Sequence, residues 1–259
     1  MGPRFDIGKI DDVIHGRLRL GVMAYLTNAE VADFNELKDH QPFFAEFQCL
    51  EPHAPWHSLD MYAEEGLAVD PAEVELPPYY PDTPETRTTW ARYLSSVQVF
   101  DAKVGKVREM LEQEGLLEDT VIMVLTDHGR DMVRGKFNLY DAGIHLPLVV
   151  WIPEQHRPAD YEPGTVSDRL TSGVDITPTM LSLAGVELPA NLHGAPFLGP
   201  EAKEREYAYA HRDRVITHID RSRAVVDQRF HYIRNYMPDQ PGFFPPSLYQ
   251  QLDIGYDEV

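Results

Sequence analysis

Short apolar runs separated by polar, proline-containing stretches set the pattern of this chain. Runs at 43–50, 121–125 and 146–152 are too short for helices, and the second is rich in β-branched residues. Such runs predict strands buried in a sheet, and we expect the run at 121–125 to be buried on both faces. Between 206 and 236 the runs become shorter, and Asp227 and Gln228 separate two of them. That spacing predicts a hairpin near the C-terminal end of the chain.

A helical period fills the stretch before the run at 121–125. Apolar residues recur at spacings of three and four positions across residues 90–111, which predicts a long amphipathic helix. Thr83 suits the N-cap of this helix, Pro84 its first position and Gly115 its end. A helix that leads into a buried strand indicates an α/β fold with a largely parallel sheet.

Composition excludes several classes of protein. The chain has 259 residues, of which 43% are hydrophobic, so it can build one large domain or two small ones. The 42 acidic and 23 basic residues give a net charge of −19, which repels nucleic acid and anionic membranes. A single cysteine excludes an internal disulfide. No apolar run approaches the roughly 20 residues of a membrane span, and no signal core opens the chain. We therefore expect a cytoplasmic protein without nucleic-acid or membrane partners.

Residues able to do chemistry collect directly after the run at 121–125. Asp127 and His128 follow it at once, and a basic loop with Arg130, Arg134 and Lys136 leads to the next apolar run. Ligand sites of open α/β sheets lie at the carboxyl ends of strands. On residue types alone, a solvated basic loop explains the pattern as well as a binding site does.

The order of these residues resembles the sulfatase family, within the alkaline phosphatase superfamily. The chain reads DHG at 127–129, then a loop with Lys136, then YDAGIHLPLVV at 140–150. The family pattern is D-[NH]-G, a lysine loop, and Y-x-x-G-[IV]-R-x-P before an apolar strand. VDITPTMLSLAGV at 174–186 resembles a family helix, for which Asp175 is a candidate cap. RAVVDQRFHYIRNYMP at 223–238 resembles the small C-terminal antiparallel sheet of branches similar to heparan N-sulfatases.

The resemblance implies a fold and a set of roles. It implies an α/β fold with a mostly parallel sheet flanked by helices, incomplete at the N-terminus, and a small C-terminal antiparallel sheet. Asp127 and His128 are expected to bind a divalent cation, usually calcium, and Lys136 to contact the sulfate. A hard cation prefers carboxylate oxygen, and a lysine can balance charge on a leaving oxygen. His145 stands where the family has arginine, and we expect it and Arg134 to contact the substrate.

A second segment bears on catalysis. Glu51 to Trp56 resembles the P-H-x-P segment of the family, in which the histidine faces the sulfate. His53 is therefore expected to act with Lys136 in catalysis, although an ordinary loop histidine is the alternative. The family nucleophile is a modified cysteine or serine in the context C/S-x-P/A-x-R, and no segment of this sequence matches it. The acidic pair of metal ligands is not found either, and Cys49 is expected to be an unreactive core thiol.

Residues 1–40 differ from the rest and resemble the opening of winged-helix transcription regulators. No recognition helix or β-wing follows Lys38, and the segment carries five basic against seven acidic residues. DNA reading needs a helix in the major groove and a basic surface. A helical arm or an oligomerisation segment is therefore favoured over DNA binding. The expected division is this segment, a sulfatase-like core at 41–200 and a small subdomain at 201–259.

The sequence thus predicts a protein of the sulfatase family, acting on sulfate esters or sulfamates of a small molecule or glycan. Its missing chemistry would be supplied in a homo-oligomer or by another chain. A non-catalytic protein that binds sulfated ligands or serves as a scaffold is the alternative, and a DNA-binding regulator is disfavoured. Phosphonate and phosphodiester hydrolases share these motifs, so sulfate against phosphate stays open.

Overall fold

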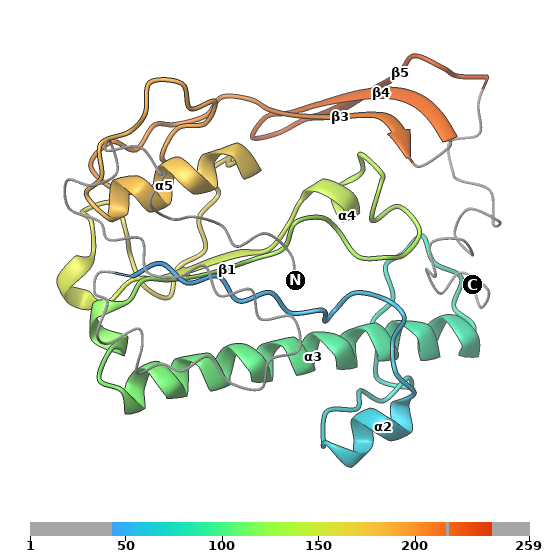
Figure 1. The fold of residues 1–259 in the computed structure, drawn as a ribbon. Helices are drawn as coiled ribbons and strands as arrows, with labels where there is room; N and C mark the ends of the chain where they lie inside the picture. Colours follow the sequence, from blue (N-terminus) through green and yellow to red (C-terminus); the bar gives the residue numbers. More distant parts are fainter. Residues whose placement is uncertain (1–42, 216–217, 240–259) are drawn as a thin grey trace, which may run out of the picture.

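The computed structural model describes residues 43–215 and 218–239 of the chain (Figure 1). The helical segment predicted within residues 1–40 lies outside these ranges. The described elements are α2 (Leu59–Glu64), α3 (Pro84–Gln113), η3 (Leu117–Asp119), β1 (Ile122–Leu125), α4 (Asp141–Ile144), β2 (Leu148–Trp151), η4 (Glu154–His156), η5 (Gly173–Asp175), α5 (Ile176–Leu183), β3 (Ala208–Val215), β4 (His218–Val226) and β5 (His231–Asn235).

The long helix α3 runs beneath β1 and β2, and the sheet of β3, β4 and β5 covers the opposite side of the molecule (Figure 1). Thr83 is the N-cap of α3 and accepts a hydrogen bond from the Thr86 amide at 3.2 Å. Pro84 is the first helical residue, and the helix ends just before Gly115, which has a φ of +68°. A left-handed residue after a helix is a common stop because glycine adopts it without strain. The predicted helix is confirmed at both ends.

Two buried clusters join α3 to the rest of the core. At its C-terminal end, Leu111, Leu116 and Leu117 are buried together, and Ile122 of β1 and Trp151 of β2 pack against them. Near its N-terminal end, a second cluster joins α3 to the loop after β1, through Val74, Tyr80, Trp90, Ala91 and Met132. The apolar stripe of α3 is therefore core packing, as its spacing indicates.

Strands β1 and β2 pair in the antiparallel direction, with Ile122 opposite Trp151 and Leu125 opposite Leu148. No parallel pair occurs within residues 43–215 and 218–239, so the predicted parallel pairing is wrong for these strands. The reason lies in their connection, which carries only the four-residue helix α4 and so lacks the crossover helix that parallel neighbours need. Burial on both faces is also wrong, because Leu125 is 41% exposed and Val149 is 59% exposed.

The run at 43–50 is extended but does not form a strand. Its residues alternate between half-buried and exposed, and Phe43 and Phe47 pack against the cluster at the end of α3. An apolar run alone cannot distinguish a paired strand from an extended segment that covers a helix.

The C-terminal part forms the predicted antiparallel sheet, in the order β3–β4–β5. Its hairpin turn falls where expected, since the Asp227 amide donates to the Phe230 carbonyl at 3.0 Å. The Asp227 carboxylate accepts hydrogen bonds from the Arg229 and Phe230 amides, and these hold the pKa of that carboxyl below its usual range. The sheet lies over α4 (Figure 1), and Ala224 of β4 is buried.

Asp175 is a structural residue rather than a simple helix cap. Its buried carboxylate accepts hydrogen bonds from the Ser172 amide at 2.9 Å, the Ala195 amide at 3.0 Å and Arg205 Nε at 2.9 Å. It thereby ties the start of α5 to the segment that leads into β3. Among the described helices, none is both long enough and apolar enough to cross a membrane.

Candidate functional site

Three side chains from distant parts of the chain meet beside the loop that follows β1. Lys136 Nζ lies 2.8 Å from His53 Nε2 and 3.1 Å from Asp131 Oδ1. Asp131 Oδ2 lies 3.5 Å from His53 Nε2 and accepts a hydrogen bond from the Ala54 amide at 3.3 Å. The structure thus brings together both residues predicted to be catalytic, and we call His53, Asp131 and Lys136 the lysine corner.

Burial within the lysine corner is graded. The Asp131 side chain is 2% exposed, that of Lys136 is 15% exposed and that of His53 is 47% exposed. Because His53 Nδ1 contacts the Ala54 carbonyl, this nitrogen carries the proton in the neutral ring and Nε2 accepts from Lys136. The arrangement presents one imidazole to solvent, with an ammonium behind it and a buried carboxylate behind both.

Asp131 is not among the residues predicted from the sequence. It is one of several charged residues in the loop, and its most informative contact is with Ala54, 77 positions earlier in the chain. A buried carboxylate is expected to have partners, but the sequence does not show which acidic residue is buried.

The loop between β1 and β2 is closed by contacts between glycines. The Gly129 amide donates to the Gly143 carbonyl at 3.2 Å. A Cβ atom placed on Gly129 would lie 2.0 Å from the Ala142 carbonyl oxygen, and one on Gly143 would lie 2.1 Å from that of Asn138. Only residues without a side chain allow the two ends of the loop to approach this closely.

Aromatic residues brace the same loop from the side of α3. The Tyr80 hydroxyl donates to the Val133 carbonyl at 2.9 Å, and burial raises the pKa of Tyr80 to about 12. The hydroxyl therefore remains a donor at all ordinary pH values. The Arg130 guanidinium lies 5.1 Å from the centre of the Trp90 ring, a cation–π contact. The loop is thus packed onto α3 rather than solvated.

Asp127 and His128 form a more open pair beside the lysine corner, with the ring centres of His128 and His53 6.4 Å apart in an edge-on contact. Asp127 Oδ2 lies 3.5 Å from His128 Nε2, while His128 Nδ1 lies 2.9 Å from the Gly129 carbonyl. That carbonyl favours the proton on Nδ1, which leaves Nε2 as an electron-pair donor beside a carboxylate. Two donors so placed fit part of a divalent cation's coordination. They do not complete it, since the described residues contain no group of three such side chains able to hold a metal.

The two predicted substrate contacts are held by other groups than those of the lysine corner. Arg134 has a φ of +65°, and its guanidinium lies 4.8 Å from the Tyr79 ring centre and 4.3 Å from that of Tyr140. His145 is exposed at the C-terminal end of α4. Neither has a hydrogen bond or ion pair with the lysine corner among the described contacts, and their roles stay predictions.

The segment that carries His53 is tied to α3 by an ion pair. Lys103 Nζ lies 2.5 Å from Glu51 Oε2. Burial acts to raise the pKa of Glu51, but the hydrogen bond from Lys103, a backbone hydrogen bond and the charges of Lys103 and His57 together outweigh it and hold that pKa below its usual range. In the same segment, burial raises the pKa of the Cys49 thiol. The thiol is only half-buried, so the prediction of a core position is wrong, and its lack of reactivity stays a prediction.

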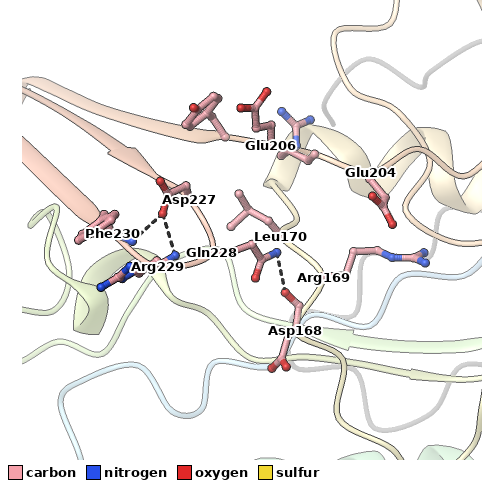
Figure 2. Close-up of a pocket in the computed structure, with 11 residues that line it drawn as sticks. Asp168, Arg169, Leu170, Glu204, Glu206, Asp227, Gln228, Arg229 and Phe230 are labelled. Atoms are coloured by element: carbon pink, nitrogen blue, oxygen red, sulfur yellow. Dashed lines mark hydrogen bonds between the residues drawn. The ribbon is translucent and has the colours of Figure 1, made fainter.

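A cavity of about 850 Å³ lies elsewhere, between the hairpin turn and the segments at 168–170 and 204–207 (Figure 2). Its arginines are largely engaged, since Arg169 pairs with Asp160 and Arg205 with Asp175. Gln228 reaches across it and donates to the Asp168 carbonyl at 3.0 Å. None of the predicted site residues lines this cavity, and the lysine corner is the better candidate on chemical grounds.

Comparisons with known proteins agree with the resemblance. The family model described as Sulfatase matches residues 11–186, and that described as N-sulphoglucosamine sulphohydrolase, C-terminal matches residues 132–242. The first match begins inside the segment at 1–40, and the resemblance of that segment to winged-helix proteins stays a prediction.

Curated relatives and solved structures point the same way. An ulvan-active sulfatase of Formosa agariphila is 37% identical over 68% of this chain and 29% of its own length. The human N-sulphoglucosamine sulphohydrolase is 31% identical over 62% of this chain and 35% of its own length. This chain thus spans about a third of the length of these relatives.

Among solved structures, a sulfatase yidJ of Bacteroides fragilis, described as putative, aligns with a TM-score of 0.62 at 19% identity, over 85% of this chain and 53% of that one. This likeness shows the α/β fold expected from the sequence. The matched family models cover the loop after β1, Lys136 and the C-terminal sheet. The chain therefore belongs to the sulfatase family.

Proposed function

We propose that this chain forms the sulfate-binding corner of a sulfatase site and takes part in the hydrolysis of sulfate esters or sulfamates. The observation that carries the proposal is the contact of Lys136 Nζ with His53 Nε2 at 2.8 Å, backed by the buried Asp131. An anion on the exposed side of this pair could accept hydrogen bonds from both His53 and Lys136.

His53 and Lys136 could also assist the departure of the leaving group, which is the alcohol of a sulfate ester or the amine of a sulfamate. His53 is half-exposed and can deliver a proton to the leaving atom, which is the work of a general acid. Lys136 can balance the negative charge that develops there. Asp131 keeps the Lys136 ammonium in place and prevents it from turning toward solvent.

Asp127 and His128 are proposed as two ligands of a divalent cation, with calcium as the expected ion. When bound, such a cation neutralises charge on sulfate oxygens. The orientation of His128 by the Gly129 carbonyl supports a role as a ligand, because it exposes the lone pair of Nε2 beside Asp127. The remaining ligands would come from outside the described residues.

A sulfated glycan is the proposed substrate class. It is suggested by the relatives, since one is an ulvan-active sulfatase and another an N-sulphoglucosamine sulphohydrolase.

Completion of the site in a homo-oligomer or by a second chain, and a cytoplasmic location, also stay proposals. The alternative function is binding of a sulfated ligand without catalysis. It is favoured by the sequence, in which no segment matches the C/S-x-P/A-x-R context of the family nucleophile.

The test is hydrolysis of a chromogenic aryl sulfate and of the matching phosphate ester, each with and without calcium. Lys136→Ala and Asp127→Ala are the informative variants, and Lys106→Ala, an exposed lysine on α3, is the matched control. Calcium-dependent turnover lost in both variants but kept in the control would support the proposed reaction. Sulfate binding by calorimetry without turnover would favour the alternative. If the protein shows no sulfate binding and no turnover, both the proposed function and its alternative are contradicted.

A further inference from the structure

The C-terminal sheet reaches the loop of the lysine corner through one arginine. Arg212 lies on β3, and its Nη1 donates to the Phe137 carbonyl at 2.9 Å and to Asn138 Oδ1 at 3.2 Å. Asn138 Nδ2 in turn donates to the Lys136 carbonyl at 3.1 Å. A chain of hydrogen bonds therefore runs from the sheet to the backbone of Lys136, and its link from Arg212 to Asn138 spans 74 positions of sequence.

The participants are buried and fixed. The Arg212 side chain is 10% exposed, and its second terminal nitrogen pairs with Asp220, whose side chain is 3% exposed. Asn138 is 3% exposed. A buried guanidinium that is shared between a carboxylate and two acceptors has little freedom, because each donor direction is fixed by the planar fork.

The backbone at this point needs external support. Phe137, the residue after Lys136, has a φ of +70°, which is strained for a residue with a bulky side chain. Such a conformation persists only where the surroundings hold it, and the Arg212 hydrogen bond acts on the carbonyl of this same residue. A change of φ at Phe137 would turn the Lys136 peptide and swing its side chain away from His53.

We propose that Arg212, held by Asp220 and acting through Asn138 and the Phe137 carbonyl, is the positioning residue of Lys136. The C-terminal sheet would thereby control whether the lysine corner is assembled. The inference concerns the lysine that the proposed function uses. Its test reads that lysine directly, so a lack of hydrolysis and a failure of this inference are separate results.

The experiment measures the rate at which an amine reagent labels Lys136, by mass spectrometry on the full chain, relative to the exposed Lys106. The main variant is Arg212→Met with Asp220→Leu, which removes both buried charges together and avoids leaving one unpaired. Arg234→Met, an exposed arginine on β5 of the same sheet, is the control. We expect labelling of Lys136 to rise about tenfold in the double variant, the effect of losing one hydrogen bond to a charged group. It should not change in the control.

Unchanged labelling of Lys136 in a folded double variant would overturn the proposal. If the double variant unfolds, labelling of every lysine rises together, and Arg212→Lys then decides the matter. A lysine can keep the ion pair with Asp220 but lacks the fork that serves Phe137 and Asn138 as well. Faster labelling of Lys136 alone in this variant supports the proposal, and a rate equal to that of the unmodified protein refutes it.

Discussion

The lysine corner and the Asp127–His128 pair lie close together in the chain but differ in how they are held. Asp131 is buried at the back of the lysine corner and contacts groups from two segments. Asp127 is 85% exposed, and its described contact is with its own neighbour. One group is therefore preorganised by the fold, whereas the other depends on what binds to it. An anion bound at the lysine corner would find its contacts already in place, whereas a cation bound by Asp127 and His128 would have to order them.

The largest effect that tests this contrast is expected from Asp131→Ala. Removing the carboxylate leaves the Lys136 ammonium, 15% exposed, without its buried partner, which costs about 3 kcal/mol or more of unfolding free energy. Asp127→Ala removes an exposed carboxylate and should change stability by no more than about 0.5 kcal/mol. Urea unfolding measures both. Equal losses would mean that the two groups are held alike.

The next effect concerns anion binding at the exposed edge of the corner. His53→Ala should weaken sulfate binding about tenfold, since one hydrogen bond to a charged ligand is lost. His145→Ala is the matched control, because this histidine is exposed at the end of α4 and has no described contact with Lys136. Isothermal titration with sulfate distinguishes them. A greater loss from His145→Ala would move the anion site away from the lysine corner.

A smaller effect is expected from the ion pair that ties the His53 segment to α3. Since the pKa of Glu51 is lowered in the fold, the pair stabilises the protein above the unfolded pKa of about 4.3 and stops doing so as pH falls through the folded value. Lys103 is 44% exposed, so Lys103→Met should cost at most about 1 kcal/mol at neutral pH.

In acid below the lowered pKa of Glu51, the Lys103→Met variant and the unmodified protein should converge in stability. High salt at neutral pH should reduce their difference as well. Lys106→Met on the exposed side of α3 serves as the control. A difference that grows in acid would rule out this account of the Glu51 ion pair.

The smallest effect is expected from calcium itself. Two donors bind a cation weakly, and a site filled to about half stabilises the fold by only about 0.4 kcal/mol. We expect a slight rise in melting temperature with calcium that Asp127→Ala abolishes and Asp131→Ala retains. A large rise would show that the described residues hold more of the metal site than their geometry indicates.

The sequence predicted those features whose causes are local. Thr83, Pro84 and Gly115 mark the ends of α3 by their own conformational preferences, and Asp227 marks the hairpin in the same way. The family pattern placed His53 and Lys136 together, and the structure agrees. Features that depend on distant pairing were missed. The antiparallel direction of β1 and β2 depends on the path of their connection, and the burial of Asp131 depends on Ala54.

The contact between Gly129 and Gly143 has a consequence for how this protein can vary. Any missense change at either codon adds a side chain where a carbonyl oxygen lies about 2 Å from the Cβ position. Substitutions at these two positions are therefore expected to disrupt the loop, and variants of this protein that keep the loop should keep both glycines.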